Sequence, residues 1–259
     1  LKYKRKSLTL MGCEFTGIVN FLGDPDRPLD LGKKIVFKNC VFEKPLQFRN
    51  CHSVDTIEND FSQKSSAIQI INGRYILFRI SNCELPFGID IYSEEDDKIE
   101  IDWFESHYNR FSKAGYSFDH VTFKSRFDLN GDTVENLGIS FRNCISTSPF
   151  RIESVESPSI SFWGTNSIFE KDIRIWGGSI KSLIWNHGEF NDEVDITSVE
   201  VTESLTISGS VFNDGFLFRR KDSGSQIRNF ILPKQIWIQD TKFQNGFEFH
   251  GDLFKADKL

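Results

Sequence analysis

The chain has 259 residues, a mass of 29.9 kDa and a formal net charge of −6, and it contains 26 Phe beside only 5 Trp and 5 Tyr. Hydrophobic residues make up 39% and charged residues 26% of the sequence, which is ordinary for a globular domain and excludes disordered and collagen-like chains. No apolar run approaches the roughly 18 residues of a membrane-spanning helix, and the first residues are neither an initiator Met nor a signal peptide. We therefore expect a fragment of a longer protein.

A short pattern recurs from residue 13 to residue 249: a small residue, a Phe two positions later, and two further apolar residues in alternation. The copies span 13–21, 40–48, 83–91, 121–129, 144–152, 167–175, 188–196, 210–218 and 241–249, with an imperfect one at 59–67. An apolar column precedes the Phe of each copy and consists of Leu8, Ile35, Val54, Phe78, Tyr116, Ile139, Ile160, Leu183, Leu205 and Ile236. Alternation with a period of two, broken by turns such as Asn213-Asp214-Gly215, predicts short strands separated by tight corners.

The repeat length of about 22 residues fits one coil of a solenoid, because stacked coils bury equivalent residues on one another. The sequence therefore predicts an all-β fold: a right-handed parallel β-helix of about ten coils. It forms a single domain over 1–259 with insertions at 22–33, 92–115 and 219–234.

The small-residue column followed by Phe, as in Cys13 to Phe15 and Cys40 to Phe42, resembles the pentapeptide-repeat proteins. That resemblance covers nearly the whole chain and implies a right-handed β-helix with a small residue and then Leu or Phe pointing inward. The repeat step here is longer than the five residues of that family, so the resemblance concerns architecture and transfers no activity.

The cysteines are interpreted as packed thiols. Four of them, Cys13, Cys40, Cys83 and Cys144, occupy the small-residue column, and Cys51 stands apart. Their odd number favours a reducing compartment, so we expect a cytoplasmic protein. The sequence has no CxxC or HxxxH pair and its five His are scattered, so neither a metal nor a cofactor is expected.

A polar column faces outward between the two apolar residues after each Phe. It contains Asp90 and Asp128, which would be adjacent if residues 92–115 form an insertion within a single step. Two adjacent carboxylates suit acid–base chemistry or a cation. The alternative is a solvated face, where Arg151 pairs with Asp128 and Arg174 with Asp195.

The largest insertion is predicted to hold a short helix over about 94–113. Ser93 can cap it, acidic residues suit its first turn, and Gly115 can end it. Five side chains then share one helical face, either packed on the solenoid or free to bind a partner: Trp103, Phe104, His107, Tyr108 and Phe111.

The last insertion is interpreted as a basic, mobile and solvated loop, with phosphate or nucleic-acid contact as the alternative. Its candidate side chains are Arg219, Arg220, Lys221 and Arg228. Two outward columns are unusually apolar, and such a strip would suit a homodimer, a partner protein or another part of the parent chain. Their members are Val36, Leu77, Ile184 and Trp237, and Val41, Ile145, Ile168 and Val211.

The leading functional interpretation is a non-enzymatic protein-interaction or scaffold module of a larger, bacterial protein. Its partners would be a protein or other domains of the parent chain, and nucleic acid is not expected. One alternative, implied by the resemblance, is a DNA-mimic-like inhibitor of a nucleic-acid enzyme, although 31 basic residues interrupt the 37 acidic ones. The other is a carbohydrate-binding or carbohydrate-cleaving β-helix that uses Asp90 and Asp128, with Trp163 or Trp176 nearby.

Overall fold

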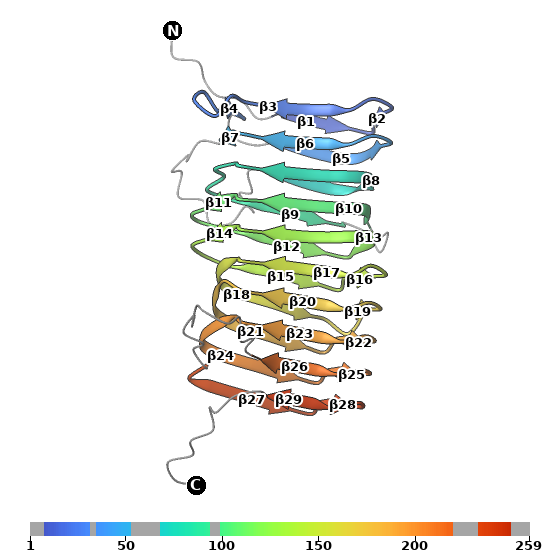
Figure 1. Cartoon of the computed structure of the whole chain (residues 1–259). Helices are drawn as coiled ribbons and strands as arrows, with labels where there is room; N and C mark the ends of the chain where they lie inside the picture. The colour runs from blue at the N-terminus through green and yellow to red at the C-terminus, as the bar shows by residue number, and fades with distance from the viewer. Residues whose placement is uncertain (1–7, 32–34, 53–67, 94–98, 220–232, 250–259) are drawn as a thin grey trace.

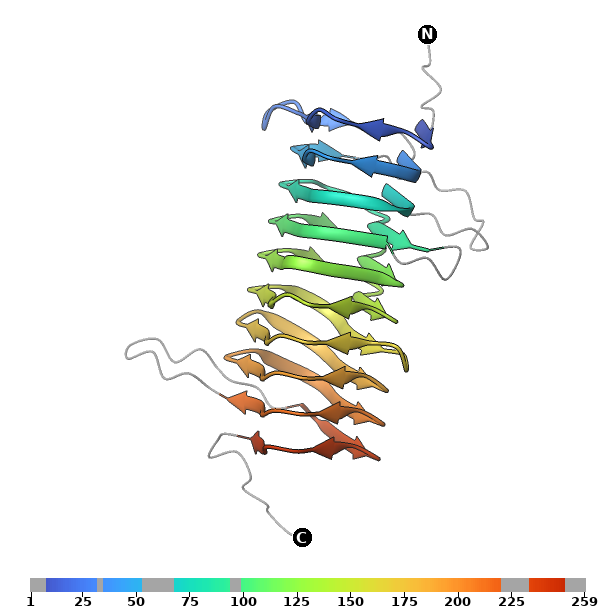
Figure 2. The same cartoon turned by 90° about the vertical axis from the view of Figure 1, so that its right-hand side faces the viewer.

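The computed structural model describes residues 8–31, 35–52, 68–93, 99–219 and 233–249. Within these ranges every regular element is a β-strand, and the strands stack as a parallel β-solenoid, as the sequence predicts (Figures 1 and 2). No helix in the described ranges is long and apolar enough to cross a membrane.

The strands, in chain order, are β1 (Leu8–Met11), β2 (Glu14–Phe15), β3 (Val19–Leu22), β4 (Leu29–Asp30), β5 (Ile35–Phe42), β6 (Leu46–Arg49), β7 (Cys51–His52), β8 (Ile68–Ser81), β9 (Ile89–Tyr92), β10 (Ile99–His107), β11 (Arg110–Phe111), β12 (Tyr116–Asp119), β13 (Val121–Asn130), β14 (Thr133–Val134), β15 (Ile139–Arg142), β16 (Ile145–Ser146), β17 (Phe150–Glu153), β18 (Glu156–Trp163), β19 (Ile168–Phe169), β20 (Ile173–Trp176), β21 (Ser179–Asn186), β22 (Glu189–Phe190), β23 (Val194–Thr197), β24 (Glu200–Ser208), β25 (Val211–Phe212), β26 (Phe216–Arg219), β27 (Gln235–Gln239), β28 (Lys242–Phe243) and β29 (Phe247–Phe249).

The parallel register links equivalent residues of successive coils into columns. The column that starts each coil runs through Leu8, Ile35, Ile68, Ile89, Tyr116, Ile139, Ile160, Leu183, Leu205 and Ile236. The solenoid as a whole has about eight turns, slightly fewer than the ten coils expected.

Two members of the predicted column are wrong. Ile68 and Ile89 take the positions assigned to Val54 and Phe78, and Val54 lies outside the described residues. Phe78 pairs instead with Leu46 and Phe104, on another face of the solenoid. The error arose because β8 runs through a whole coil as one continuous strand and lacks the small-residue pattern. The alternation of apolar and polar residues also looks the same on every face of the solenoid.

Each coil turns through left-handed backbone at two corners. The first corner has positive φ at Asn39, Asn72, His120, Asn143, His187 and Asp240 and at Gly12, Gly164 and Gly209; the second has it at Asn50, Asn82, Tyr108, Ser154 and Ser198 and at Gly131 and Gly177. Asn and Gly tolerate this conformation best, which explains their recurrence. The amide of the left-handed residue joins the next coil; that of Asn143, for example, donates to the Trp163 carbonyl at 3.0 Å.

The small-residue column has a physical cause at these corners. Its side chain hydrogen-bonds the carbonyl two residues earlier, just before the left-handed residue: Cys144 Sγ to Arg142 O at 3.4 Å, Ser210 Oγ to Ser208 O at 3.1 Å, and Thr241 Oγ1 to Gln239 O at 2.8 Å. A short side chain with a donor therefore adds a second hydrogen bond to a carbonyl that already accepts a corner amide of the preceding coil.

The cysteines occupy both corners, which corrects their predicted grouping. Cys13, Cys40 and Cys144 follow the first corner, whereas Cys83 joins Cys51 at the second, where the Glu84 amide donates to the Cys51 carbonyl at 2.8 Å. All five are free thiols. Burial raises the pKa of Cys144 to about 12, so this thiol stays protonated and inert at neutral pH.

The interior is filled by stacked aromatic rings. Phe104, Phe127 and Phe150 stack in one column with ring centroids 5.1 and 3.8 Å apart, and Phe118 and Phe141 stack in the next at 5.0 Å. All five side chains are almost completely buried. Because the columns also meet edge to face, the Phe excess of the sequence is the filling of a continuous core.

The predicted inserted helix is wrong. Residues 99–107 form β10, which pairs with β8 on one side and with β13 on the other. The apolar residues of this segment satisfy the helical spacing by coincidence, because a register shift between Ile101 and Trp103 interrupts the alternation that would have identified the strand.

Candidate interaction surface

The predicted acid pair does not exist as an adjacent pair. Asp128, in β13, lies between Glu105 and Arg151, whereas Asp90, in β9, lies between Gln69 and Ser117 on a different outer face. The sequence interpretation placed Asp90 one face away from its true column because the register of two coils was shifted. The two carboxylates therefore do not form the acid–base site that the carbohydrate-cleaving alternative needs.

The five side chains assigned to the helix face do not share a surface. Phe104 and Phe111 are buried in the core, and Trp103 lies half-buried beneath the guanidinium of Arg126, 5.4 Å from the ring centroid. His107 ends β10, and Tyr108 takes the left-handed corner with 65% of its surface exposed. Strand geometry, with its two-residue period, distributes them inward and outward.

The basic insertion is described at only one of its four candidate residues. Arg219 ends β26 and binds Asp195, with Nη2 2.6 Å from Oδ2. Arg220, Lys221 and Arg228 lie outside the described residues. Arg219 is therefore part of a cross-coil ion pair within the solenoid.

The outer face that carries Arg219 bears charges of both signs, with the acids Glu105 and Asp128 adjacent and the arginines Arg151 and Arg174 adjacent. Arg151 neighbours Asp128 and Arg174 neighbours Asp195 in register, as expected. The ion pairs differ from those expected, because Arg174 binds Asp172. The remaining contacts on this face join Arg79 to Glu105 at 2.5 Å and Arg126 to Asp128 at 2.5 Å.

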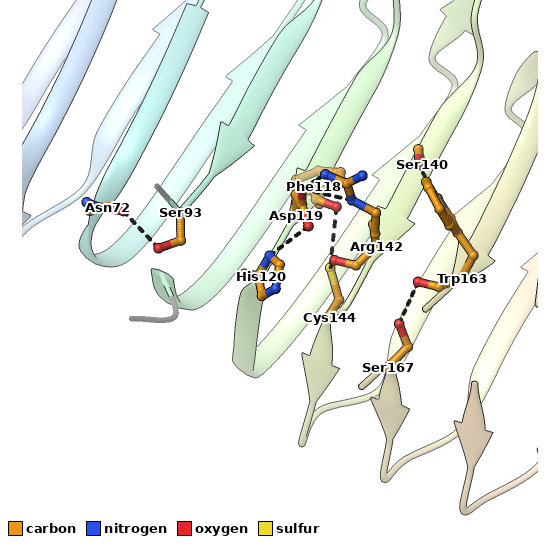
Figure 3. Close-up of polar contacts among 10 residues, drawn as sticks. All are labelled: Asn72, Ser93, Phe118, Asp119, His120, Ser140, Arg142, Cys144, Trp163 and Ser167. Carbon is orange, nitrogen blue, oxygen red and sulfur yellow. Dashed lines mark hydrogen bonds and ion pairs between the residues drawn. The ribbon is translucent and has the colours of Figure 1, made fainter. Parts of the chain in front are cut away.

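A compact group of side chains gathers on the outer face of β12, β15 and β18 (Figure 3), and we call it the Trp163 platform. It consists of Asp119, His120, Ser140, Arg142 and Trp163. Asp119, Arg142 and Trp163 each end their strand directly before the first corner, so the register stacks them in one column. The sequence interpretation named Trp163 only as a possible neighbour of Asp90 and Asp128, and it missed Asp119 and Arg142 because it did not follow the position before the left-handed residue.

The platform is held together by directed contacts. Arg142 Nε donates to Asp119 Oδ2 at 2.8 Å, and its Nη2 reaches the same oxygen. His120 Nδ1 lies 2.8 Å from Asp119 Oδ1, so the nearly buried carboxylate contacts both side chains. The Arg142 guanidinium lies over the Trp163 ring, 5.1 Å from its centroid, and Trp163 Nε1 donates to Ser140 Oγ at 3.0 Å.

The electrostatics of the platform keep Arg142 charged and in place. The hydrogen bond to Asp119 is the main cause that raises the pKa of Arg142, and the charges of Asp119 and Asp90 act in the same direction. Trp163 is 40% exposed and the Arg142 side chain 41% exposed. The result is a half-exposed cation beside an indole. Contacts within the protein already restrict the rotamers of both side chains.

A second polar cluster lies inside the solenoid. Asp132 accepts from the Asn109 backbone amide at 2.7 Å, from Ser106 Oγ at 2.6 Å and from Tyr116 Oη at 2.8 Å. Burial is the largest cause that raises the pKa of Asp132, to about 6. Asp132, Ser106 and Asn109 are at most 2% exposed, so this cluster serves the core and not a ligand.

Comparison with protein-family models, curated proteins and solved structures finds no match. The fold and surface define the class: a parallel β-solenoid with a preorganised Arg–Trp platform on one outer face. In the described residues, no group of three or more His, Cys, Asp or Glu side chains is arranged to hold a metal ion.

Proposed function

We propose that the protein is a non-enzymatic interaction or scaffold module that binds a partner protein through the Trp163 platform. The observation that carries the proposal is the contact between Arg142 and the half-exposed Trp163 ring. A hydrogen bond to Asp119 holds the Arg142 guanidinium in this position. Trp and Arg dominate binding energy at protein interfaces, and preorganised side chains lose little entropy when a partner docks.

The cellular setting belongs to the same proposal. Five free thiols, most of them buried, support a reducing compartment, for which the bacterial cytoplasm is our choice. The recurring small residue before Phe supports a distant architectural relation to the pentapeptide-repeat proteins. No enzymatic activity is part of this proposal.

The test compares Trp163→Ala with Trp176→Ala, its matched control on another outer face, where Trp176 is 50% exposed. Partners captured by the wild-type chain are purified, and their Kd values are measured against both variants. We expect Trp163→Ala to weaken binding at least about tenfold and Trp176→Ala to leave it unchanged.

Circular dichroism and thermal unfolding must show that both variants remain folded. Equal Kd values for the wild-type chain and Trp163→Ala would reject the platform as the binding surface. Binding of a glycan that Trp163→Ala abolishes, without any protein partner, would reject protein interaction in favour of carbohydrate recognition.

A further inference from the structure

Two buried cysteines lie on neighbouring levels of the second corner. Arg49 pairs with Ser81 in register. Cys51 and Cys83, each two residues further along the chain, therefore occupy equivalent positions of successive coils. The Glu84 amide donates to the Cys51 carbonyl at 2.8 Å, so the alignment continues through the corner. The two cysteines are neighbours in one inward column although they belong to different coils.

The two thiols point the same way and contact each other. Cys51 Sγ lies 3.3 Å from the Arg49 carbonyl oxygen. Cys83 Sγ lies at the same distance, 3.3 Å, from the Ser81 carbonyl oxygen. A hydrogen bond joins the two thiols. The residues are only 1% and 2% exposed, so core packing holds the pair in this arrangement.

This arrangement meets the geometric requirement of a disulfide. Neighbouring strands of a parallel sheet are about 4.8 Å apart, and a disulfide joins residues whose Cα atoms are about 4.4–6.8 Å apart. Register partners with side chains on the same side of the sheet satisfy this range without movement of the backbone. The column therefore places two free thiols where an S–S bond can form between coils.

The contact gives the two thiols different reactivities. The hydrogen bond with Cys83 is the main cause that lowers the pKa of Cys51, and the same hydrogen bond is the main cause that raises the pKa of Cys83. Because the thiolate is the nucleophile, Cys51 is the thiol that reacts first. Cys144 is different, since its register neighbours are Val121 and Ser167, which carry no thiol.

We propose that Cys51 and Cys83 form a reversible disulfide between two coils when the protein is exposed to hydrogen peroxide. The Cys51 thiolate attacks a peroxide oxygen: an S–O bond forms, the O–O bond breaks, and the released hydroxide takes up a proton and becomes water. The Cys83 sulfur then attacks the sulfenic acid of Cys51. The S–S bond forms, the S–O bond breaks, and the hydroxyl leaves as water with the Cys83 proton. Two thiols are oxidised and one peroxide is reduced.

A second register pair, Cys13 and Cys40, is removed so that the reaction can be assigned. Serine is suited to this corner, because Ser167 and Ser210 occupy the equivalent position in later coils. The double variant Cys13→Ser with Cys40→Ser is the background for the experiment, and it keeps the other three cysteines. Circular dichroism checks that it is folded.

The folded background variant is treated with hydrogen peroxide, its remaining thiols are alkylated in urea, and its peptides are mapped by mass spectrometry. We expect one linked peptide pair, joined through Cys51 and Cys83, and an alkylated Cys144. Dithiothreitol should restore both thiols of the pair. The same linked peptides should appear in the peroxide-treated wild-type chain, where their masses distinguish them from a bond between Cys13 and Cys40.

The matched control adds Cys83→Val to the background. Val155 and Val199 are buried at the equivalent corner position of other coils, so valine fits the column. This variant should form no disulfide within the chain, and Cys51 should carry the sulfenic acid or its further oxidation products.

The background variant unfolded in urea shows whether the peroxide treatment is sufficient to oxidise its thiols. If that treatment leaves Cys51 and Cys83 free for alkylation in the folded protein, the proposal is overturned. Disulfides that contain Cys144, or that join two molecules in place of the linked pair, overturn it as well.

Discussion

At the scale of single residues, the outward positions next to the first corner carry Asp119, Arg142 and Trp163 of the Trp163 platform. Asp119 is nearly buried although it points away from the core, because Arg142 and His120 surround its carboxylate. Because the Arg142 side chain is 41% exposed, its pair with Asp119 adds at most about 1 kcal/mol to stability. Its main effect is to hold the Arg142 guanidinium over the Trp163 ring.

The interior carboxyl of Asp132 predicts a pH-dependent stability. Its pKa is about 6 in the folded protein and 3.8 in the reference state, so the native state retains a proton that the unfolded chain has lost between these values. This contribution is complete below about pH 4 and is lost as the pH rises through 6, a difference of about 3 kcal/mol.

Asp132→Asn should remove that dependence, because the amide cannot titrate and still offers an acceptor to the Asn109 amide. Urea unfolding of both proteins between pH 4 and 7 measures the difference in the free energy of unfolding. Exposed Asp214→Asn serves as the control. A parallel pH profile for wild type and Asp132→Asn would contradict the assignment.

At the scale of elements, each coil is defined by its corners more than by its strands. Left-handed backbone recurs at both corners, and the following side chain satisfies the carbonyl before it. The strands between are short, with four residues in β12, β15 and β17. Corner residues therefore control where each sheet face ends.

Adjacent glycines at the second corner provide a matched test. Gly178 has φ +83°, and a Cβ there would overlap the Val155 carbonyl, so Gly178→Ala should cost more than about 2 kcal/mol. Gly177 has φ +63° with its nearest atom, Ser154 Oγ, at 3.5 Å. Gly177→Asn should be nearly neutral, since Asn50 and Asn82 occupy the same corner. Equal free energies of unfolding for the two variants would refute this account.

At the scale of the whole molecule, stability comes from contacts between neighbouring coils. Within the described residues, parallel pairing joins 27 strands into one sheet, β4 and β7 pair with each other, and the buried hydrophobic residues form one cluster. A coil in the middle of such a stack has two neighbours, whereas a terminal coil has one. Equivalent core substitutions should therefore have position-dependent costs.

Phe212 and Phe243 stack on each other in one column, with centroids 5.1 Å apart, and Phe212 also stacks on Phe190 at 4.8 Å. Phe212→Ala should cost about 3–5 kcal/mol, because Phe212 is almost completely buried between two levels. Phe243→Ala should cost about half as much, since it loses fewer contacts. Urea unfolding measures both costs, and identical costs would contradict stacking as the source of stability.

The sequence by itself determined the architecture, because a solenoid places equivalent residues in columns and any column of Phe or small residues is visible as a period. It predicted parallel strands, inward Phe and packed thiols. Only the tertiary structure decided the register of the coils that begin at Ile68 and Ile89, and with it the separation of Asp90 from Asp128. Alternation has a period of two on every face, so local pattern cannot say which face a strand occupies. Predicting the Trp163 platform would have required the same register, since its side chains meet across coils and not along the chain.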